Sequence, residues 1–209
     1  MSRDAQSFSR KGARFKPQPR VLVLCEDTKS GKNYLEDAAR YYRSFAVVEF
    51  SHCGHTDSIG IVQEAIKRQN DFEEIYCVLD RDSHPSWNAA FVLAKSNVKI
   101  TIIPSYPCFE YWVLLHFEFT RAPFSSVGNH SAADRVLKDL RKKSGFENYE
   151  KGYKGCLFDD LFNNLDKARL NAIRSITEAE STQEKNPSTL IHELLDKFEE
   201  LSKPKLKKV

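Results

Sequence analysis

The chain has 209 residues, of which 41% are hydrophobic and 11% aromatic, enough for one α/β domain with appendages or for two small domains. No apolar run approaches the roughly 18 residues of a membrane span, and no apolar segment follows the basic N-terminus, so we expect neither a membrane protein nor a signal peptide. Five cysteines without a CxxC pair favour free thiols in a reducing cytoplasm.

The net charge of +3 is unevenly distributed along the chain. Residues 1–20 carry +5 and residues 203–209 carry +4, which leaves −6 on the residues between them. We interpret both ends as basic, disordered tails on an acidic core. Such tails suit contact with a polyanion such as nucleic acid, although tails that only solubilise the protein would have the same composition.

Apolar runs alternate with amphipathic segments in the first half of the chain and predict a βα series. The apolar runs predict strands at 21–25, 45–50, 75–79 and 98–103, the last ended by Pro104. The helical spacing of apolar residues predicts helices at 32–43, with Ser30 as its cap, at 56–70 and at 85–96. Right-handed crossovers between these strands would build a parallel sheet.

The second half of the chain is expected to be mostly helical. Its patterns predict helices at 109–117, 131–143 and 159–180, and a last one that Asn186-Pro187-Ser188-Thr189 starts. We therefore place an α/β core at 21–120 and a helical part packed on it at 121–202, between an N-terminal tail at 1–20 and a C-terminal tail at 203–209.

Acidic residues stand where two predicted strands end. Glu26 follows the strand at 21–25, and Asp80 and Asp82 follow the strand at 75–79. Residues two apart in an extended chain point to the same side, so the two aspartates can converge. Because parallel strands end at the same edge of a sheet, the three acids offer oxygen ligands to Mg²⁺ or Mn²⁺. Alternatively, the aspartates cap the next helix and Glu26 is a solvated turn residue.

A metal ion at this edge would suit phosphodiester chemistry, because it can neutralise phosphoryl oxygens and activate water for in-line attack. Lys29 and Lys32 lie in the turn after the first strand, next to a helix N-terminus, where a phosphate or nucleic acid can bind. His84, two residues after Asp82, could contact a phosphate or transfer protons near neutral pH. A solvated loop histidine is the alternative for His84.

Glu110 lies inside a very apolar segment, and buried carboxylates are rarely left unpaired. Its sequence position leaves three roles open. The side chain pairs with a cation, caps a helix, or faces the acidic residues from the end of the fourth strand.

The motifs around these residues resemble those of the RloB-like family. The matching stretches run in order from about residue 20 to about residue 200, and the one containing Glu110 is the most specific. They are Val23-Leu24-Cys25-Glu26, Lys29-Ser30, Asn33-Tyr34, Leu79-Asp80-Arg81-Asp82-Ser83-His84, Ser105 to Phe117 and Asn186-Pro187-Ser188-Thr189.

The resemblance implies a Toprim-like α/β fold, with a mostly parallel sheet flanked by helices and a helical C-terminal part. It also implies a metal-dependent nuclease acting on DNA or RNA in abortive-infection defence against phage, with an AAA- or ABC-type ATPase partner encoded nearby. Toprim catalytic and metal positions carry over as Glu26, Asp80 and Asp82, and Glu110 matches a recurrent glutamate of the family. In the family, the position of Gly31 often holds a further acid, and its absence here weakens the case for a second metal ligand from this loop without affecting Glu26, Asp80 and Asp82.

Two competing functions remain open at this point. A receiver-like phosphoacceptor also gathers acids at strand ends, but it needs a lysine at the end of a later strand, and Lys99 stands near the start of the fourth. A non-catalytic partner of an ATPase would use the acidic site for binding only. No motif selects DNA or RNA, and a homo-oligomer is compatible with the sequence.

Overall fold

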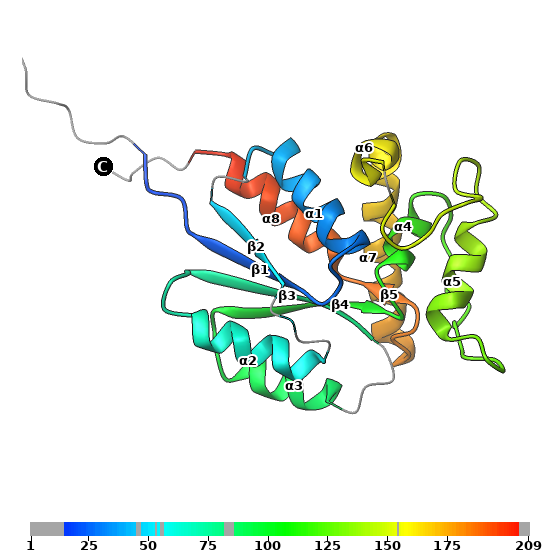
Figure 1. Ribbon diagram of the computed structural model, residues 1–209, viewed down its shortest axis with the longest axis horizontal. Coiled ribbons are helices and arrows are strands. Elements are labelled where there is room, and N and C mark those ends of the chain that lie inside the picture. The colour runs from blue at the N-terminus through cyan, green and yellow to red at the C-terminus, as the bar shows by residue number, and fades with distance from the viewer. Residues whose placement is uncertain are drawn as a thin grey trace, which may run out of the picture.

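Five strands form one sheet in the order β2-β1-β3-β4-β5, in which β5 alone runs antiparallel to its neighbour (Figure 1). The computed structural model describes residues 15–44, 47–52, 54, 57–81, 86–153 and 155–204. The strands are β1 (Val21–Cys25), β2 (Val48–Ser51), β3 (Glu74–Asp80), β4 (Ile100–Tyr106) and β5 (Ser188–Thr189). The expected mixed α/β architecture, a mostly parallel sheet with flanking helices, is confirmed.

Helices cover both faces of the sheet (Figure 1). The helices α1 (Ser30–Tyr41) and α8 (Ile191–Ser202) lie on one face, and α2 (Ser58–Arg68) and α3 (Trp87–Lys95) lie on the other. The remaining helical segments gather beyond the β4–β5 edge, with α5 outermost, and form the expected helical C-terminal region. They are α4 (Glu110–Leu115), α5 (Ala132–Leu140), α6 (Leu157–Leu161), the 3₁₀ turn η2 (Phe162–Asn164) and α7 (Leu165–Thr182).

The sequence of β1 is apolar throughout because the strand is buried on both faces. Val21 and Val23 pack with α1, α4 and α8 in one core cluster, whereas Leu22 and Leu24 pack with α2 and α3 in the other. A central parallel strand is buried on both faces, so it needs a continuous apolar run. The larger cluster extends to Leu201, and residues of the helical part therefore share a core with the sheet.

No helix within the described part of the chain is both long enough and apolar enough to cross a membrane.

The prediction that Pro104 ends the fourth strand is wrong, because β4 continues to Tyr106. A proline within a strand removes one donor from the sheet. Here the carbonyl of Pro104 accepts from the Leu190 N–H at 3.1 Å, on the side of β5. The nitrogen of Pro104 faces the β5 side, where β5 pairs only with Ser105 and Tyr106. Its lack of an N–H group therefore costs no hydrogen bond between β3 and β4.

Two expected helix boundaries are also wrong. Ser188 and Thr189 form β5 rather than the start of the last helix, which begins at Ile191. The hydroxyl groups of Ser105 and Thr189 form a buried hydrogen bond of 2.8 Å that holds this short strand. The single helix expected at 159–180 is divided by η2, whose asparagines favour turns over helix interiors.

His116 is buried at the end of α4 and makes stability depend on pH. Its Nδ1 bonds the Trp112 carbonyl at 3.0 Å, and its Nε2 has no hydrogen-bond partner among the described residues. Burial lowers the pKa of His116 from 6.5 to about 4. Between these values the unfolded chain binds a proton that the folded chain excludes, so the free energy of unfolding falls as the pH drops.

We expect His116→Phe to remove this dependence. Between about pH 7 and about pH 5, the wild type should lose about 2 kcal/mol more unfolding free energy than the variant, because one pKa unit corresponds to about 1.4 kcal/mol. Urea unfolding at both pH values measures the difference. Equal losses in the two proteins would contradict a neutral, buried His116.

Candidate functional site

Two of the predicted acids meet at the carboxyl ends of adjacent parallel strands. Glu26 follows β1, and its N–H donates to the Val78 carbonyl at 3.1 Å, which extends the β1–β3 ladder by one residue. Asp80 is the last residue of β3. One carboxylate oxygen of Glu26, Oε2, accepts from the Asp80 N–H at 3.1 Å. This hydrogen bond fixes the two acids side by side.

The acids open into a cleft of about 440 Å³. Its lining combines both strand ends with the residues at the start of α5 and one lysine from a distant loop. The lining includes Glu26, Asp27, Asp80, Arg81, Cys108, Ser131 and Lys151. The cleft therefore joins the sheet to the helical part at the edge where the strands end.

Glu110 is the first residue of α4 and is only 1% exposed. No nitrogen or hydroxyl group in the described ranges donates to its carboxylate oxygens, but the Cys108 thiol lies within hydrogen-bonding reach of the side chain. The nearest opposite charge is the Lys151 Nζ, 3.8 Å from Glu110 Oε2. Burial of a carboxylate costs free energy unless a charge or a hydrogen bond compensates it, and Lys151 and Cys108 are the groups beside Glu110 that can do so.

The charges of this cluster act on one another. Burial, Glu110 and Glu26 raise the pKa of Asp80 well above its ordinary value, and Lys151 only partly opposes them. Burial, Glu110 and Asp80 raise the pKa of the Cys108 thiol, which stays protonated. Burial disfavours the Lys151 ammonium, but Glu110 and Asp80 outweigh burial and raise its pKa. The site thus concentrates negative charge that a cation would stabilise.

The chemistry of these donors fits Mg²⁺ or Mn²⁺, since both ions prefer carboxylate oxygens. Glu26 and Asp80 would be the residues that hold such an ion. Within the described ranges, however, no three His, Cys, Asp or Glu side chains are grouped so that they could hold a metal. Asp82, the third predicted ligand, lies outside the described residues, as does His84. The three-acid metal site therefore stays a prediction.

Comparison with known proteins agrees with the sequence motifs. The family model described as RloB-like protein matches residues 21–198. The chain belongs to the RloB-like family. No curated protein and no solved structure matches it. The matched range of this RloB-like protein contains the whole cleft and omits most of both basic tails.

The turn after β1 differs from the prediction for this RloB-like protein. Asp27, not Ser30, caps α1, because its carboxylate accepts from the N–H groups of Lys29, Ser30 and Gly31 at 2.8, 2.8 and 3.1 Å. These donors are already bonded, so a phosphate would have to displace Asp27 to use them. A Cβ at Gly31 would meet the Phe109 ring at 3.3 Å, so a larger residue here would require that ring to shift.

The two lysines of this turn are placed differently from each other. Lys32 forms an ion pair of 2.7 Å with Glu36 on the next turn of α1. Lys29 is exposed, and its side-chain carbons approach Gly152 in the loop that carries Lys151. Of the two predicted phosphate ligands in this RloB-like chain, Lys29 thus lies beside the loop that enters the cleft.

Lys151 is the main residue of the site that the sequence did not indicate. Its loop is anchored beside α1, because the Gly152 N–H donates to the Ser30 hydroxyl at 3.1 Å. The separation of 71 residues between Asp80 and Lys151 has no motif spacing that would reveal the contact. By contrast, Lys99 bonds the Gln69 and Phe72 carbonyls at 2.9 and 3.0 Å, at the opposite ends of the strands. It cannot serve as the lysine of a receiver-like site.

Proposed function

We propose that this protein is a Mg²⁺- or Mn²⁺-dependent phosphodiesterase that cleaves nucleic acid. The supporting observation is that Glu26 and Asp80, at the ends of β1 and β3, line one cleft together with Lys151, whose Nζ lies 3.8 Å from the buried carboxylate of Glu110. Carboxylates that bind a divalent ion, with a cation beside them, are what in-line displacement at a phosphodiester requires.

Each residue of the cleft has a role in this proposal. Glu26 and Asp80, with Asp82, would hold the ion, whose contribution is to polarise the phosphoryl group and acidify a bound water. Lys151 would bind a non-bridging phosphate oxygen as a point charge. Glu110 would keep Lys151 charged and turned toward the cleft, 3.8 Å from its own carboxylate. Lys29 and His84 would contact the phosphate from the adjoining loops.

We further propose a setting in prokaryotic anti-phage defence, with an AAA- or ABC-type ATPase as partner. Membership of the RloB-like family supports this setting. A cytoplasmic location is part of the same proposal. It is supported by the four described cysteines, which are free thiols, three of them buried.

A cleavage assay tests the proposal. The purified protein is incubated with Mg²⁺, with Mn²⁺ or with EDTA, against single-stranded DNA, duplex DNA, total tRNA and ribosomal RNA. We expect cutting of at least one substrate, with either metal and not with EDTA. Intact substrates in every reaction, with and without the neighbouring ATPase, would overturn the proposal.

One observation favours a non-catalytic alternative, in which the site only regulates or binds an ATPase partner. The acids in the described segments are not arranged as a complete metal site. Undetectable metal binding at millimolar Mg²⁺ would support this alternative. Labelling of Asp80 by acetyl phosphate would support the receiver-like version of it.

A further inference from the structure

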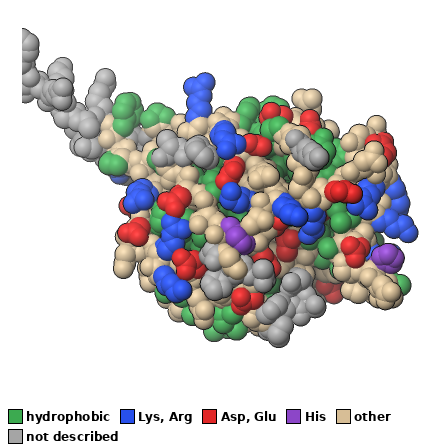
Figure 2. Space-filling model, in the orientation of Figure 1, with side chains coloured by type: hydrophobic (Ala, Val, Ile, Leu, Met, Phe, Trp, Pro, Cys, Tyr) green, Lys and Arg blue, Asp and Glu red, His purple; other side chains and the backbone are tan. Residues whose placement is uncertain are grey.

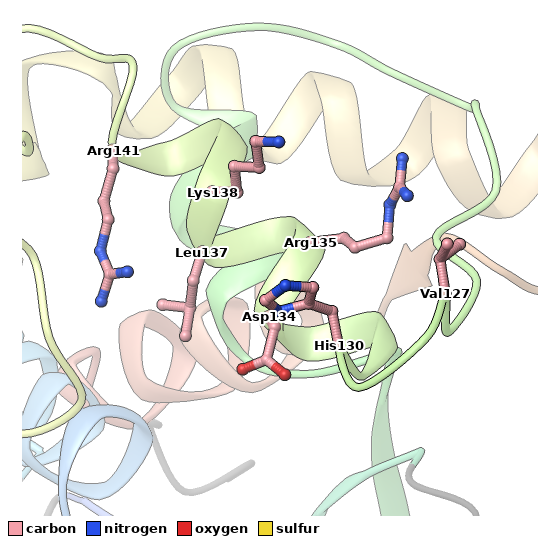
Figure 3. Close-up of a pocket in the computed structure, with 7 residues that line it drawn as sticks. All are labelled: Val127, His130, Asp134, Arg135, Leu137, Lys138 and Arg141. Atoms are coloured by element: carbon pink, nitrogen blue, oxygen red, sulfur yellow. The ribbon is translucent and has the colours of Figure 1, made fainter.

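The outermost helix, α5, presents a hollow of about 700 Å³ to solvent. Figure 3 shows the basic side chains that line it: Arg135 and Lys138 project from the helix, and Arg141 lies just beyond its C-terminal end. His130 borders the hollow from the preceding loop. In the space-filling view, Lys and Arg side chains gather at this end of the molecule (Figure 2).

The cations of the hollow are available to a ligand. Arg135 and Lys138 are exposed and form no side-chain hydrogen bond or ion pair with any other described residue. Their neighbours Lys142 and Lys143, in contrast, pair with Asp139 and Glu118 at 2.5 and 2.6 Å. The chain therefore neutralises the lysines after α5 and leaves the two cations on its exposed face unpaired.

Of the described residues, Asp134 is the one acid that lines the same hollow, and its carboxylate is hydrogen-bonded to Ser131 at the start of α5. The Oδ2 atom of Asp134 accepts from the N–H and the hydroxyl of Ser131, both at 2.8 Å, in a capping box. Arg141 uses its Nε to donate to the Tyr149 carbonyl at 2.9 Å, which fixes the guanidinium at one end of the hollow. Three cations against one acid leave a net positive surface.

The hollow and the cleft both border α5, the cleft at its N-terminal end and the hollow along its exposed face. Ser131, Ala132 and Ala133, at the start of α5, line the cleft, and Asp134 and Arg135 begin the hollow. At about 1.5 Å per residue, the nine residues of α5 span roughly 13 Å. One strand of a duplex places a phosphate about every 3.4 Å along its axis, so this length matches roughly four phosphates.

We propose that the α5 hollow binds the phosphodiester backbone of a nucleic acid whose scissile phosphate lies in the cleft. The proposal rests on the proposed function and identifies where the substrate strand leaves the active site. Arg135, Lys138 and Arg141 contact phosphates and not base edges, so they add affinity without sequence specificity. The strand then follows α5 for about four nucleotides beyond the cleft.

The test compares the double variant Arg135→Gln/Lys138→Gln with the wild type. Binding of labelled single-stranded and duplex oligonucleotides is followed by fluorescence anisotropy in EDTA, at several salt concentrations. We expect weaker binding, and a slope of log K against log salt that is smaller by about 1.8 for a duplex or about 1.4 for a single strand. In cleavage assays, KM should rise while kcat stays close to the wild-type value.

Two control variants separate the effect of charge at α5 from other effects. Lys67→Gln removes an exposed lysine from α2, which covers one face of the sheet whereas α5 lies beyond the β5 edge, and should bind as the wild type does. Arg135→Lys/Lys138→Arg keeps both charges and should restore the salt slope. If only the Gln variant loses salt-dependent binding, nucleic-acid binding at the hollow is supported. If no substrate is cut in the same experiments, the proposed function fails but binding at the hollow does not. If the Gln variant has the affinity, the salt slope and the KM of the wild type, the proposal that the hollow binds nucleic acid is overturned, and the proposed function is unaffected.

Discussion

Replacing Asp80 with Asn should reduce metal-dependent cleavage by at least about 10²–10³-fold, the usual cost of removing one preorganised group that stabilises a transition state. Asn keeps the volume of the side chain and loses its charge. The Asp80 N–H still donates to Glu26, because that hydrogen bond uses the backbone. Since burial and Glu110 disfavour the Asp80 carboxylate, its removal should leave the stability of the metal-free protein unchanged or higher.

Cleavage rates of the wild type and Asp80→Asn, with melting curves in EDTA, measure these effects. Asp71→Asn is the matched control, because Asp71 is exposed just before β3, at the opposite end of the strand. Asp71→Asn should cut at the wild-type rate. Full activity of Asp80→Asn would remove this residue from the chemistry.

Replacing Glu110 with Gln should stabilise the metal-free protein and inactivate it. The variant removes a buried charge that disfavours the ionised form of Asp80, so the unfolding free energy of the metal-free protein should rise. The lost attraction to the part-exposed Lys151 is worth about 1 kcal/mol or less. Because Lys151 loses the carboxylate that holds it, cleavage should fall by about 10²-fold.

Denaturant unfolding in EDTA, paired with the cleavage assay, tests Glu110. Added Mg²⁺ should stabilise the wild type more than Glu110→Gln, because a ligand that binds only the folded state raises the unfolding free energy. A destabilised variant with wild-type activity would show that Glu110 serves the fold and not the reaction.

The site residues that the sequence predicts correctly in position are those at the ends of strands. Apolar runs locate β1 and β3, parallel pairing brings their ends to one edge, and Glu26 and Asp80 meet there as expected. Their contact needs no knowledge of the helical part. The same reasoning finds the mostly parallel sheet, whose buried central strands have the strongest apolar pattern.

The remaining features depend on tertiary contacts that local patterns do not encode. Lys151 reaches Glu110 only because its loop is anchored to Ser30. Asp27 caps α1 in place of Ser30, although both residue types are good caps and the sequence cannot rank them. The strand β5 has two residues, too few for any periodicity, and it exists because Ser105 and Thr189 pair across the sheet.

The central claim, that the strand-end acids hold a divalent ion, is tested most directly by Mn²⁺ binding measured with electron paramagnetic resonance. The wild type and Asp71→Asn should each bind one Mn²⁺ per chain, and Asp80→Asn should bind it at least about tenfold more weakly, a loss of about 1.4 kcal/mol. Equal binding by all three proteins, or none by the wild type, would contradict a metal site at Glu26 and Asp80.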